Sequence, residues 1–188
     1  MKNYTIFLII FTIIIIGVIY QYNNNNYNYN NYNLINIEHK IDKNYPKAII
    51  NTKYGDIICG FFPDIAPITS NHIINLIKKG YYNNTQFGRI EPGFVIQTDI
   101  CKDKIKCLKN IKGEFSNVKH QRGILSMGRL DHDINSNTSS FSILCGPAPH
   151  LDGQYTIFGK VLKGNDVIKT IENNKVPVVI NKITLNKN

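Results

Sequence analysis

The sequence predicts a mainly β domain, built as a closed or nearly closed antiparallel barrel and preceded by an N-terminal hydrophobic helix. Two observations predict the barrel: many short apolar runs are divided by turn residues, and only two stretches have helical character. A third observation predicts the separate helix, because residues 4–20 carry no charge and are apolar on every face. The length of 188 residues fits one domain plus an appendage.

The predicted elements of the barrel follow one another from residue 46 onward. A turn containing Gly55 separates the first two strands, while Pro67 opens the first helix and Gly80 ends it. The predicted strands are 48–52, 57–62, 94–97, 123–127, 141–144, 156–161 and 178–185, and the predicted helices are 67–79 and 166–171.

The N-terminal segment predicts the compartment. Residues 4–20 are about 17 residues long, at the short end of what can span a bilayer, and no cleavage site of small residues follows them. We therefore expect residues 1–20 to be an uncleaved signal-anchor that binds the membrane through residues 4–20, with a cleaved signal peptide as the alternative. Lys2 favours a cytoplasmic N-terminus and a lumenal domain. The expected location is a secretory-pathway membrane, in the endoplasmic reticulum or later, and secretion after cleavage stays open.

Residues 21–45 are rich in Asn and Tyr and have neither a helical nor a strand period. This composition is typical of a disordered spacer. Because the stretch is poor in acidic residues, targeting to a plastid through a bipartite signal is a further alternative. The folded domain is predicted to occupy residues 46–188.

The net charge of +9 would suit an acidic partner, but the lysines are dispersed over the chain. The local run over residues 102–112 is interpreted as a solvated basic loop, so no nucleic-acid partner is expected. The four cysteines form no C-x-x-C pair and have no His at a zinc-ligand spacing, which argues against a metal site. A disulfide between Cys101 and Cys107 is compatible with a lumenal domain, and free buried thiols are the alternative.

Four sequence blocks carry the functional prediction: residues 87–97 (FGRIEPGFVIQ), 123–127 (GILSM), 139–143 (SSFSI) and 151–161, which begins LDG and ends FGKV. In order and nearly in spacing, they resemble the motifs of cyclophilin-type peptidyl-prolyl cis-trans isomerases. The resemblance implies an eight-stranded antiparallel barrel capped by two helices, with a peptide groove on its outer face. It also implies isomerisation of X-Pro bonds in proline-containing polypeptides, without metal or cofactor.

The resemblance places Arg89 at the catalytic position. Rotation about a peptide bond is opposed by a barrier of ~18–20 kcal/mol, and a catalyst must bind the twisted amide better than either planar form. An arginine suits this task, because its guanidinium is always charged and presents fixed donors to the proline nitrogen, whose lone pair is freed by twisting.

The expected substrate-binding residues surround Arg89. Gln97 is expected to position Arg89 or the substrate backbone by hydrogen bonding. The apolar side chains expected to line the proline pocket are Phe94, Val95, Phe141 and Leu151. The other positions at which the resemblance implies substrate contact are Gly128, Ser140, Ser142, His150 and Tyr155.

Several groove positions depart from the family pattern. The substitutions are Gly88 for His, Ser140 for Gln, Ser142 for a Phe that floors the pocket, His150 for Trp, Tyr155 for His and Arg129 for Asn. Losing the Phe at position 142 costs on the order of 1–3 kcal/mol of pocket burial. The changes leave two hypotheses open: an isomerase of reduced activity, or a binding module that serves as a chaperone or assembly factor. His150 also predicts weak cyclosporin binding.

Overall fold

A computed structural model describes residues 15–23, 45–99 and 108–186. The chain divides into two compact units, Met1–Lys40 and Ile41–Asn188. In the first unit, the described residues 15–23 form an exposed helix. No helix within the described ranges is long and apolar enough to cross a membrane. Most of the predicted anchor 4–20 and most of the predicted spacer 21–45 lie outside the described residues.

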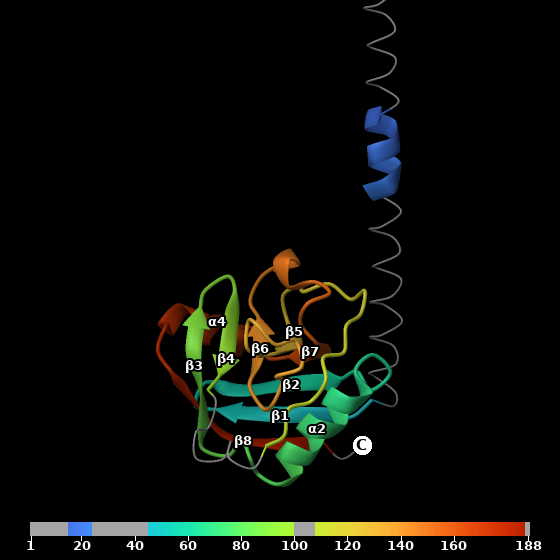
Figure 1. The fold of residues 1–188 in the computed structure, drawn as a ribbon. Coiled ribbons are helices and arrows are strands. Elements are labelled where there is room, and N and C mark those ends of the chain that lie inside the picture. Colours follow the sequence, from blue (N-terminus) through green and yellow to red (C-terminus); the bar gives the residue numbers. More distant parts are fainter. Residues whose placement is uncertain (1–14, 24–44, 100–107, 187–188) are drawn as a thin grey trace, which may run out of the picture. The chain divides into compact units, whose positions relative to one another are not determined.

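The second unit is a closed barrel of eight antiparallel strands in the order β1-β2-β7-β5-β6-β4-β3-β8 (Figure 1). This confirms the predicted fold class. The strands are β1 (Lys47–Thr52), β2 (Gly55–Phe61), β3 (Thr85–Glu91), β4 (Val95–Thr98), β5 (Ile124–Met127), β6 (Phe141–Leu144), β7 (Ile157–Lys163) and β8 (Val178–Asn186). Within the described residues, the helices of this unit are α2 (Pro67–Lys78), the short 3-10 helix η1 (Pro149–Leu151) and α4 (Asn165–Asn174).

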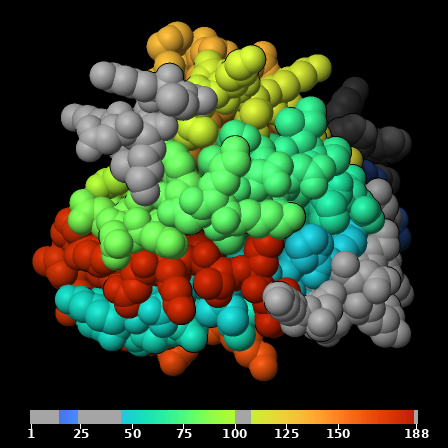
Figure 2. Space-filling model, turned by 90° about the horizontal axis from the view of Figure 1, so that it is seen from below, coloured from blue at the N-terminus to red at the C-terminus, as the bar shows by residue number. Residues whose placement is uncertain are grey.

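The C-terminal strand closes the barrel. β8 pairs with β1 on one side and with β3 on the other, so the last strand of the chain joins its first hairpin to its third strand. Figure 2 shows this face, with the red C-terminal segment forming a band between cyan and green segments. Closure therefore pairs both edges of each of these eight strands, which protects them from association with other chains.

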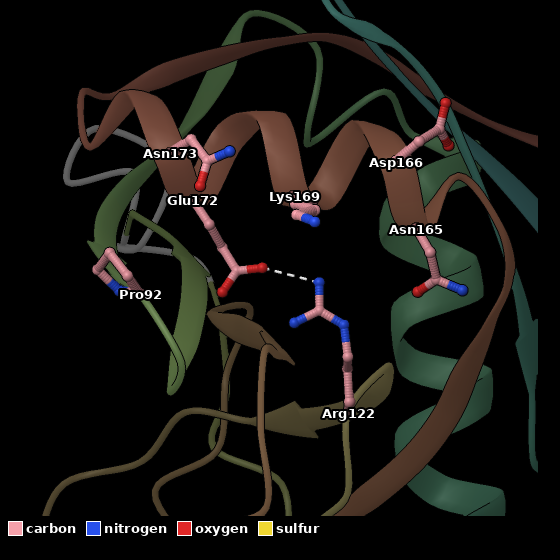
Figure 3. A pocket seen from close by; sticks show the side chains of 7 residues that line it. All are labelled: Pro92, Arg122, Asn165, Asp166, Lys169, Glu172 and Asn173. Carbon is pink, nitrogen blue, oxygen red and sulfur yellow. Dashed lines mark hydrogen bonds and ion pairs between the residues drawn. The ribbon is translucent and has the colours of Figure 1, made fainter.

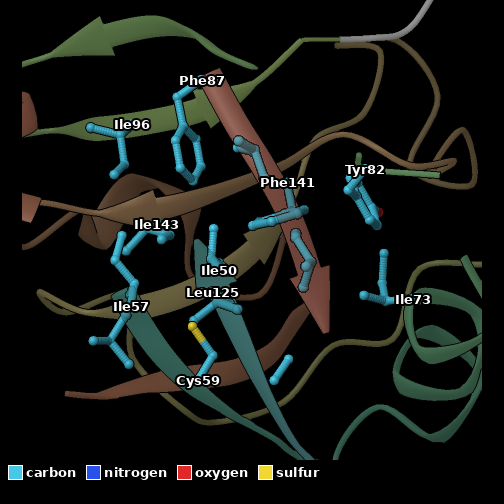
Figure 4. Packing of buried hydrophobic residues seen from close by; sticks show 14 of the residues in the cluster. Ile50, Ile57, Cys59, Ile73, Tyr82, Phe87, Ile96, Leu125, Phe141 and Ile143 are labelled. Atoms are coloured by element: carbon cyan, nitrogen blue, oxygen red, sulfur yellow. The ribbon is translucent and has the colours of Figure 1, made fainter. Parts of the chain in front are cut away.

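Side-chain alternation along the strands fills the barrel interior. In β1, Ala48 and Ile50 are buried while their neighbours are half-buried, as the period of two requires. The ring of Phe141 lies at the centre of the core in Figure 4 and makes edge-to-face contacts with Tyr82, Phe87 and Phe158. Such aromatic pairs add stabilisation beyond the apolar area that they bury.

Helix α2 forms where the sequence predicts it and buries its stripe of Ile73, Leu76 and Ile77. Its first turn begins at Pro67, which has no N–H to leave unpaired. The carboxylate of Glu114 accepts hydrogen bonds from the Ile68 and Thr69 N–H groups at 3.0 and 2.8 Å. A residue far along the chain therefore caps this helix and complements its dipole.

Strand β3 is the main difference from the predicted element list. Only Phe87 among its seven residues is fully buried, and Gln86, Arg89 and Glu91 are polar. A polar sequence of this kind lacks the apolar alternation that marks a strand. β3 forms because both its neighbours, β4 and β8, satisfy its backbone.

Candidate active-site groove

The β3–β4 hairpin brings Arg89 opposite Gln97 in the sheet register. Its turn runs from Glu91 to Phe94, and the Phe94 N–H donates to the Glu91 carbonyl at 3.0 Å. Pro92 and Gly93 occupy the two central positions, and Gly93 has a φ of +77°, as a type II turn requires. The Pro-Gly pair in the sequence thus encodes the turn that sets Arg89 beside Gln97.

The register continues this row across the sheet. Gln97 of β4 lies opposite Ser142 of β6, and Ser142 lies opposite Ser126 of β5. Directly opposed residues on antiparallel strands point to the same face. Four strands therefore present Arg89, Gln97, Ser142 and Ser126 side by side on the outside of the barrel.

This row borders a cavity of about 140 Å³. Its walls combine five apolar side chains with seven polar ones, so it is more polar than most small-ligand pockets. The lining residues are Arg89, Phe94, Val95, Gln97, Ser126, Met127, Gly128, Arg129, Asp131, Ser142, Leu144, Leu151 and Tyr155. This cavity corresponds to the peptide groove that the sequence predicts.

Most of the predicted site residues meet at this cavity, but Phe141 does not. Phe141 and Ser142 are neighbours on β6, so their side chains point to opposite faces of the sheet. Ser142 faces the cavity, whereas Phe141 is 2% exposed and belongs to the barrel core. The structure thus corrects the expectation that Phe141 lines the proline pocket.

Arg89 is held from three directions. Its Nε–H donates to Glu91 Oε1 at 2.8 Å, and one terminal nitrogen donates to Gln97 Oε1 at 3.1 Å. Its guanidinium carbon lies 5.6 Å from the centroid of the Phe94 ring. Because the Arg89 side chain is still 51% exposed, its remaining N–H groups stay available to a bound peptide.

Ser140 does not line the cavity, but it fixes Gln97. Gln97 Nε2 donates to Ser140 Oγ at 3.2 Å, and Ser140 Oγ donates in turn to the Thr98 carbonyl at 2.9 Å. Because the amide nitrogen of Gln97 is engaged by Ser140, its oxygen is left facing Arg89. Ser140 thus orients Gln97 toward Arg89.

A buried chain of polar groups supports Ser126 from behind. His120 Nε2 lies 3.0 Å from Ser126 Oγ, and His120 Nδ1 lies 3.0 Å from Asp152 Oδ1. Burial lowers the pKa of His120, which is therefore neutral. Burial alone would raise the pKa of Asp152, but hydrogen bonds from His120 and Lys119 outweigh it and hold that pKa below its usual value.

These charge states fix the direction of each hydrogen bond in the chain. An ionised carboxylate only accepts, so the Nδ1–H of neutral His120 donates to Asp152 and its Nε2 accepts from the Ser126 hydroxyl. The contacts follow the order of a Ser-His-Asp triad, but the neighbouring N–H groups of Met127 and Gly128 already donate to the Thr156 and Ser140 carbonyls. Neither N–H is free to stabilise an oxyanion, so we interpret the Ser126–His120–Asp152 hydrogen bonds as support for the floor of the groove.

His150 is exposed and does not itself line the cavity. It belongs to η1, and its ring centroid lies 5.5 Å from that of Phe94, which itself lines the cavity. At another part of the wall, the guanidinium of Arg129 lies 4.2 Å from the Tyr155 ring centroid and donates to the carbonyls of Gln154 and Asp131. Arg129 also donates to the Leu130 carbonyl, so it is fixed by Tyr155 and by three carbonyl groups.

Sequence reasoning placed Arg129 at the groove only as a departure from the family pattern, and it did not assign Ser126, Met127, Asp131 and Leu144 there. Two of them carry a signal that could have placed them there. Leu144 follows Ser142 by two residues and therefore shares its face, and Ser126 lies in the block 123–127, one of the four that carry the family resemblance. The identity of the facing residue required the register.

A second hollow, of about 530 Å³, lies between helix α4, the β3–β4 turn and the segment before β5 (Figure 3). It is lined by Pro92, Arg122, Asn165, Asp166, Lys169, Glu172 and Asn173, none of which was predicted for the site. Arg122 and Glu172 form an ion pair of 2.8 Å inside it. Although this hollow is larger, the smaller cavity holds Arg89, so we assign the site there.

The residues that line the groove include no cysteine. Residues 15–23, 45–99 and 108–186 contain no cluster of His, Cys, Asp and Glu that could hold a metal ion. Cys59 and Cys145 are free and buried, and burial raises both thiol pKa values to about 12. The predicted Cys101–Cys107 pair and most of the basic run 102–112 lie outside the described residues.

Comparison with known proteins agrees with the resemblance of the four sequence blocks. Residues 47–186 match the family described as cyclophilin type peptidyl-prolyl cis-trans isomerase/CLD. The chain is 44% identical over 146 residues to the peptidyl-prolyl cis-trans isomerase CYP23 of Arabidopsis thaliana, covering 72% of this chain and 64% of that protein. It is 34% identical over 154 residues to CYP18-1 of the same plant, covering 74% of this chain and 95% of that isomerase.

Solved structures of cyclophilin-type isomerases have a similar fold. A crystal structure of a Cryptosporidium parvum cyclophilin-type isomerase superposes with a TM-score of 0.70 at 29% identity, covering 77% of this chain and 99% of that one. A second crystal structure of that protein, in the presence of the dipeptide Ala-Pro, has a TM-score of 0.69 at 30% identity and covers 76% and 99% of the two chains.

Proposed function

Because this chain belongs to the cyclophilin-type peptidyl-prolyl cis-trans isomerase family, we propose that its groove catalyses cis/trans isomerisation of X-Pro bonds in client polypeptides. The observation that carries the proposal is the position of Arg89. Its guanidinium is oriented by Glu91 and Gln97 at the border of a cavity that Phe94, Val95 and Leu151 also line. A fixed cation next to apolar side chains that can hold a proline ring suits a reaction in which charge redistributes but no covalent bond breaks.

The proposed mechanism follows from the electronic structure of the amide. Twisting the X-Pro bond removes conjugation and leaves a lone pair on the proline nitrogen. An N–H of Arg89 donates to that nitrogen in the twisted state and finds no such acceptor in the planar forms. This difference in binding lowers the barrier. Phe94 and Leu151 grip the proline ring, and Gln97 prevents Arg89 from turning away.

The proposed substrates are proline-containing polypeptides. The similar Cryptosporidium parvum protein was crystallised in the presence of the dipeptide Ala-Pro, which supports this substrate class. Two hydroxyl groups, on Ser126 and Ser142, lie in the cavity wall, so the pocket grips an apolar ring less tightly than an aromatic floor would. We also propose weak cyclosporin binding, because His150 takes the place of the family's Trp beside the Phe94 ring.

A binding role without turnover is the second candidate, and Ser142 is the observation that favours it. Exchange NMR of the full chain with an X-Pro peptide separates the two, beside an Arg89→Ala variant. Faster cis/trans exchange that disappears in the variant supports the isomerase. Shifted peptide resonances without faster exchange would contradict the isomerase and leave a chaperone or assembly factor that holds proline segments.

We further propose that the chain acts at a secretory-pathway membrane, tethered by residues 4–20, with its isomerase domain in the lumen. The absence of charge from residues 4–20 and the position of Lys2 support this. Secretion after cleavage and plastid targeting are the alternatives. In isolated membranes, the tethered form would resist carbonate extraction and be degraded by protease only after detergent is added. A shortened, carbonate-extractable chain would instead indicate cleavage.

A further inference from the structure

The turn that carries Phe94 is tied to helix α4 by one carboxylate. The Gly93 N–H donates to Glu172 Oε1 at 3.0 Å. Arg122 donates to Glu172 Oε2 at 2.8 Å, as the dashed line in Figure 3 shows. Glu172 is only 7% exposed and shares the buried face of α4 with Val167, Ile168 and Ile171. A buried carboxylate needs such partners, and here both oxygens have one.

The same contacts close into a ring around the backbone of Phe94. Arg122 also donates to the Cys145 carbonyl, and the Cys145 N–H donates to the Phe94 carbonyl at 2.8 Å. The ring therefore runs from Glu172 through Gly93, Phe94 and Cys145 to Arg122 and back to Glu172. It fixes the backbone on both sides of the Phe94 side chain.

Glu172 also selects the conformation of the turn. Type I and type II turns differ by a flip of their central peptide, which here joins Pro92 to Gly93. In the observed type II form, the N–H of this peptide points at the Glu172 carboxylate. A flip would replace the N–H by the Pro92 carbonyl, and two oxygens would then face each other.

The charge of Glu172 persists near neutral pH. Burial by itself raises the pKa of this carboxyl, but hydrogen bonds from Arg122 and Gly93 and the positive charge of Arg122 outweigh burial. The pKa therefore lies below its usual value. Arg122 provides the neighbouring positive charge that a buried carboxylate requires.

The turn matters to the groove because Phe94 contacts the catalytic group. The Phe94 ring lies 5.6 Å from the Arg89 guanidinium on one side and 5.5 Å from the His150 ring on the other. Phe94 itself lines the cavity, whereas Glu172 and Arg122 line the separate hollow behind it. A change in the turn would displace the Phe94 ring relative to Arg89.

We propose that Glu172, held by Arg122, is a positioning residue for the isomerase groove, acting through the Gly93 N–H on the ring of Phe94. The inference rests on the proposed isomerase function and extends it to a residue that never touches the peptide. Small misplacements of groups around a reacting centre have large effects on rate.

The test compares three full-length variants in X-Pro isomerisation and thermal unfolding. Glu172→Ala removes both contacts, Glu172→Gln keeps an acceptor oxygen for Gly93, and Ile168→Val trims a fully buried core residue of the same helix. We expect Glu172→Ala to lower kcat/KM about tenfold, with Glu172→Gln within about threefold of the wild type. Ile168→Val should lower Tm without changing kcat/KM.

The amide resonance of Gly93 shows whether the Glu172 carboxylate acts on the turn, and the comparison of kcat/KM with Ile168→Val separates this effect from a loss of stability. In the wild type its proton shift should follow the titration of Glu172, and in Glu172→Gln this titration should vanish while the amide remains hydrogen-bonded. Wild-type kcat/KM in Glu172→Ala would overturn the proposal. An equal loss of kcat/KM in Ile168→Val would overturn it as well.

Two further outcomes keep the test decisive. If Glu172→Ala does not fold, Glu172→Asp keeps the charge but shortens its reach, and wild-type kcat/KM in that variant would refute the role. If the wild type itself shows no isomerisation, the proposed function fails separately, and affinity for an Ala-Pro peptide becomes the readout. Positioning then requires weaker peptide binding in Glu172→Ala and recovery in Glu172→Gln, and equal affinities would refute it.

Discussion

Replacing Ser142 by Phe tests whether the hydroxyl-lined floor limits the grip on proline. Ser142 lies between Gln97 and Ser126 in the sheet register and faces the cavity of about 140 Å³. A phenyl ring at this position would point into that cavity and meet the proline ring beside Phe94 and Leu151. The change therefore adds an apolar contact at the place where the family pattern has one.

The size of the effect follows from the geometry of the site. Full burial of a Phe side chain is worth about 1.5–3 kcal/mol. One side of the new ring would pack on the barrel whether or not peptide is bound, so only part of this energy, about 1–2 kcal/mol, serves peptide binding. That energy corresponds to about 5- to 30-fold in affinity. Since the planar and twisted forms of proline would both contact the ring, KM should fall by this factor with kcat nearly unchanged.

Exchange NMR of the full chain at several concentrations of an Ala-Pro peptide measures KM and kcat together. Val179→Phe is the matched control, because Val179 is exposed on β8 and does not line the cavity. Unchanged or weaker peptide affinity in a folded Ser142→Phe variant would refute the reasoning, as would an equal gain in Val179→Phe. A gain in affinity with still no turnover would favour the binding module.

Three further predictions follow from the groove and its support. Arg89→Lys keeps the charge but not the fork that reaches Glu91 and Gln97, so kcat/KM should fall about 10- to 100-fold. Tm should change little, because the exposed Arg89–Glu91 ion pair contributes about 0–1 kcal/mol to stability. An unchanged kcat/KM would contradict the role of the guanidinium. Ser140→Ala leaves the Gln97 amide nitrogen without its acceptor. This variant should be destabilised by about 1 kcal/mol in urea unfolding, and its kcat should be severalfold lower. An unchanged kcat would show that Gln97 needs no support from Ser140. The folded domain should lose stability as the pH falls below about 6.5, because the pKa of His120 is lower in the folded state than in the unfolded chain. The unfolded chain therefore binds the proton first as the pH falls. Between pH 7.5 and 5.5 the urea midpoint of the wild type should decline, and this decline should be absent in His120→Gln.

The sequence by itself determined the fold class and the chemistry of the groove. Short apolar strands, two helices and turns at Gly and Pro specify a barrel, because side-chain period and turn residues act locally. Arg89, Phe94 and Gln97 lie in one short block around a Pro-Gly turn, so their proximity is nearly local as well. The structure places all three in the cavity wall.

Only the tertiary structure decided which side of each strand faces the groove. Alternation in β6 separates Phe141 from Ser142, but it does not say which of the two points inward, and the sequence interpretation gave the pocket to both. The register decides, because Ser142 is opposite Gln97 and Ser126, and Phe141 must then enter the core. β3 escaped prediction for a related reason: its few buried positions become strand-like only when β4 and β8 pair with it.

The contacts that hold the groove from behind were also beyond the sequence. Gly93 and Glu172 are separated by 79 positions, and Arg122 and Glu172 by 50. No local period or motif links residues so far apart, since their contact depends on how α4 packs against the barrel. Local rules thus specify which groups the chain has, whereas the closure of the barrel determines which of them meet.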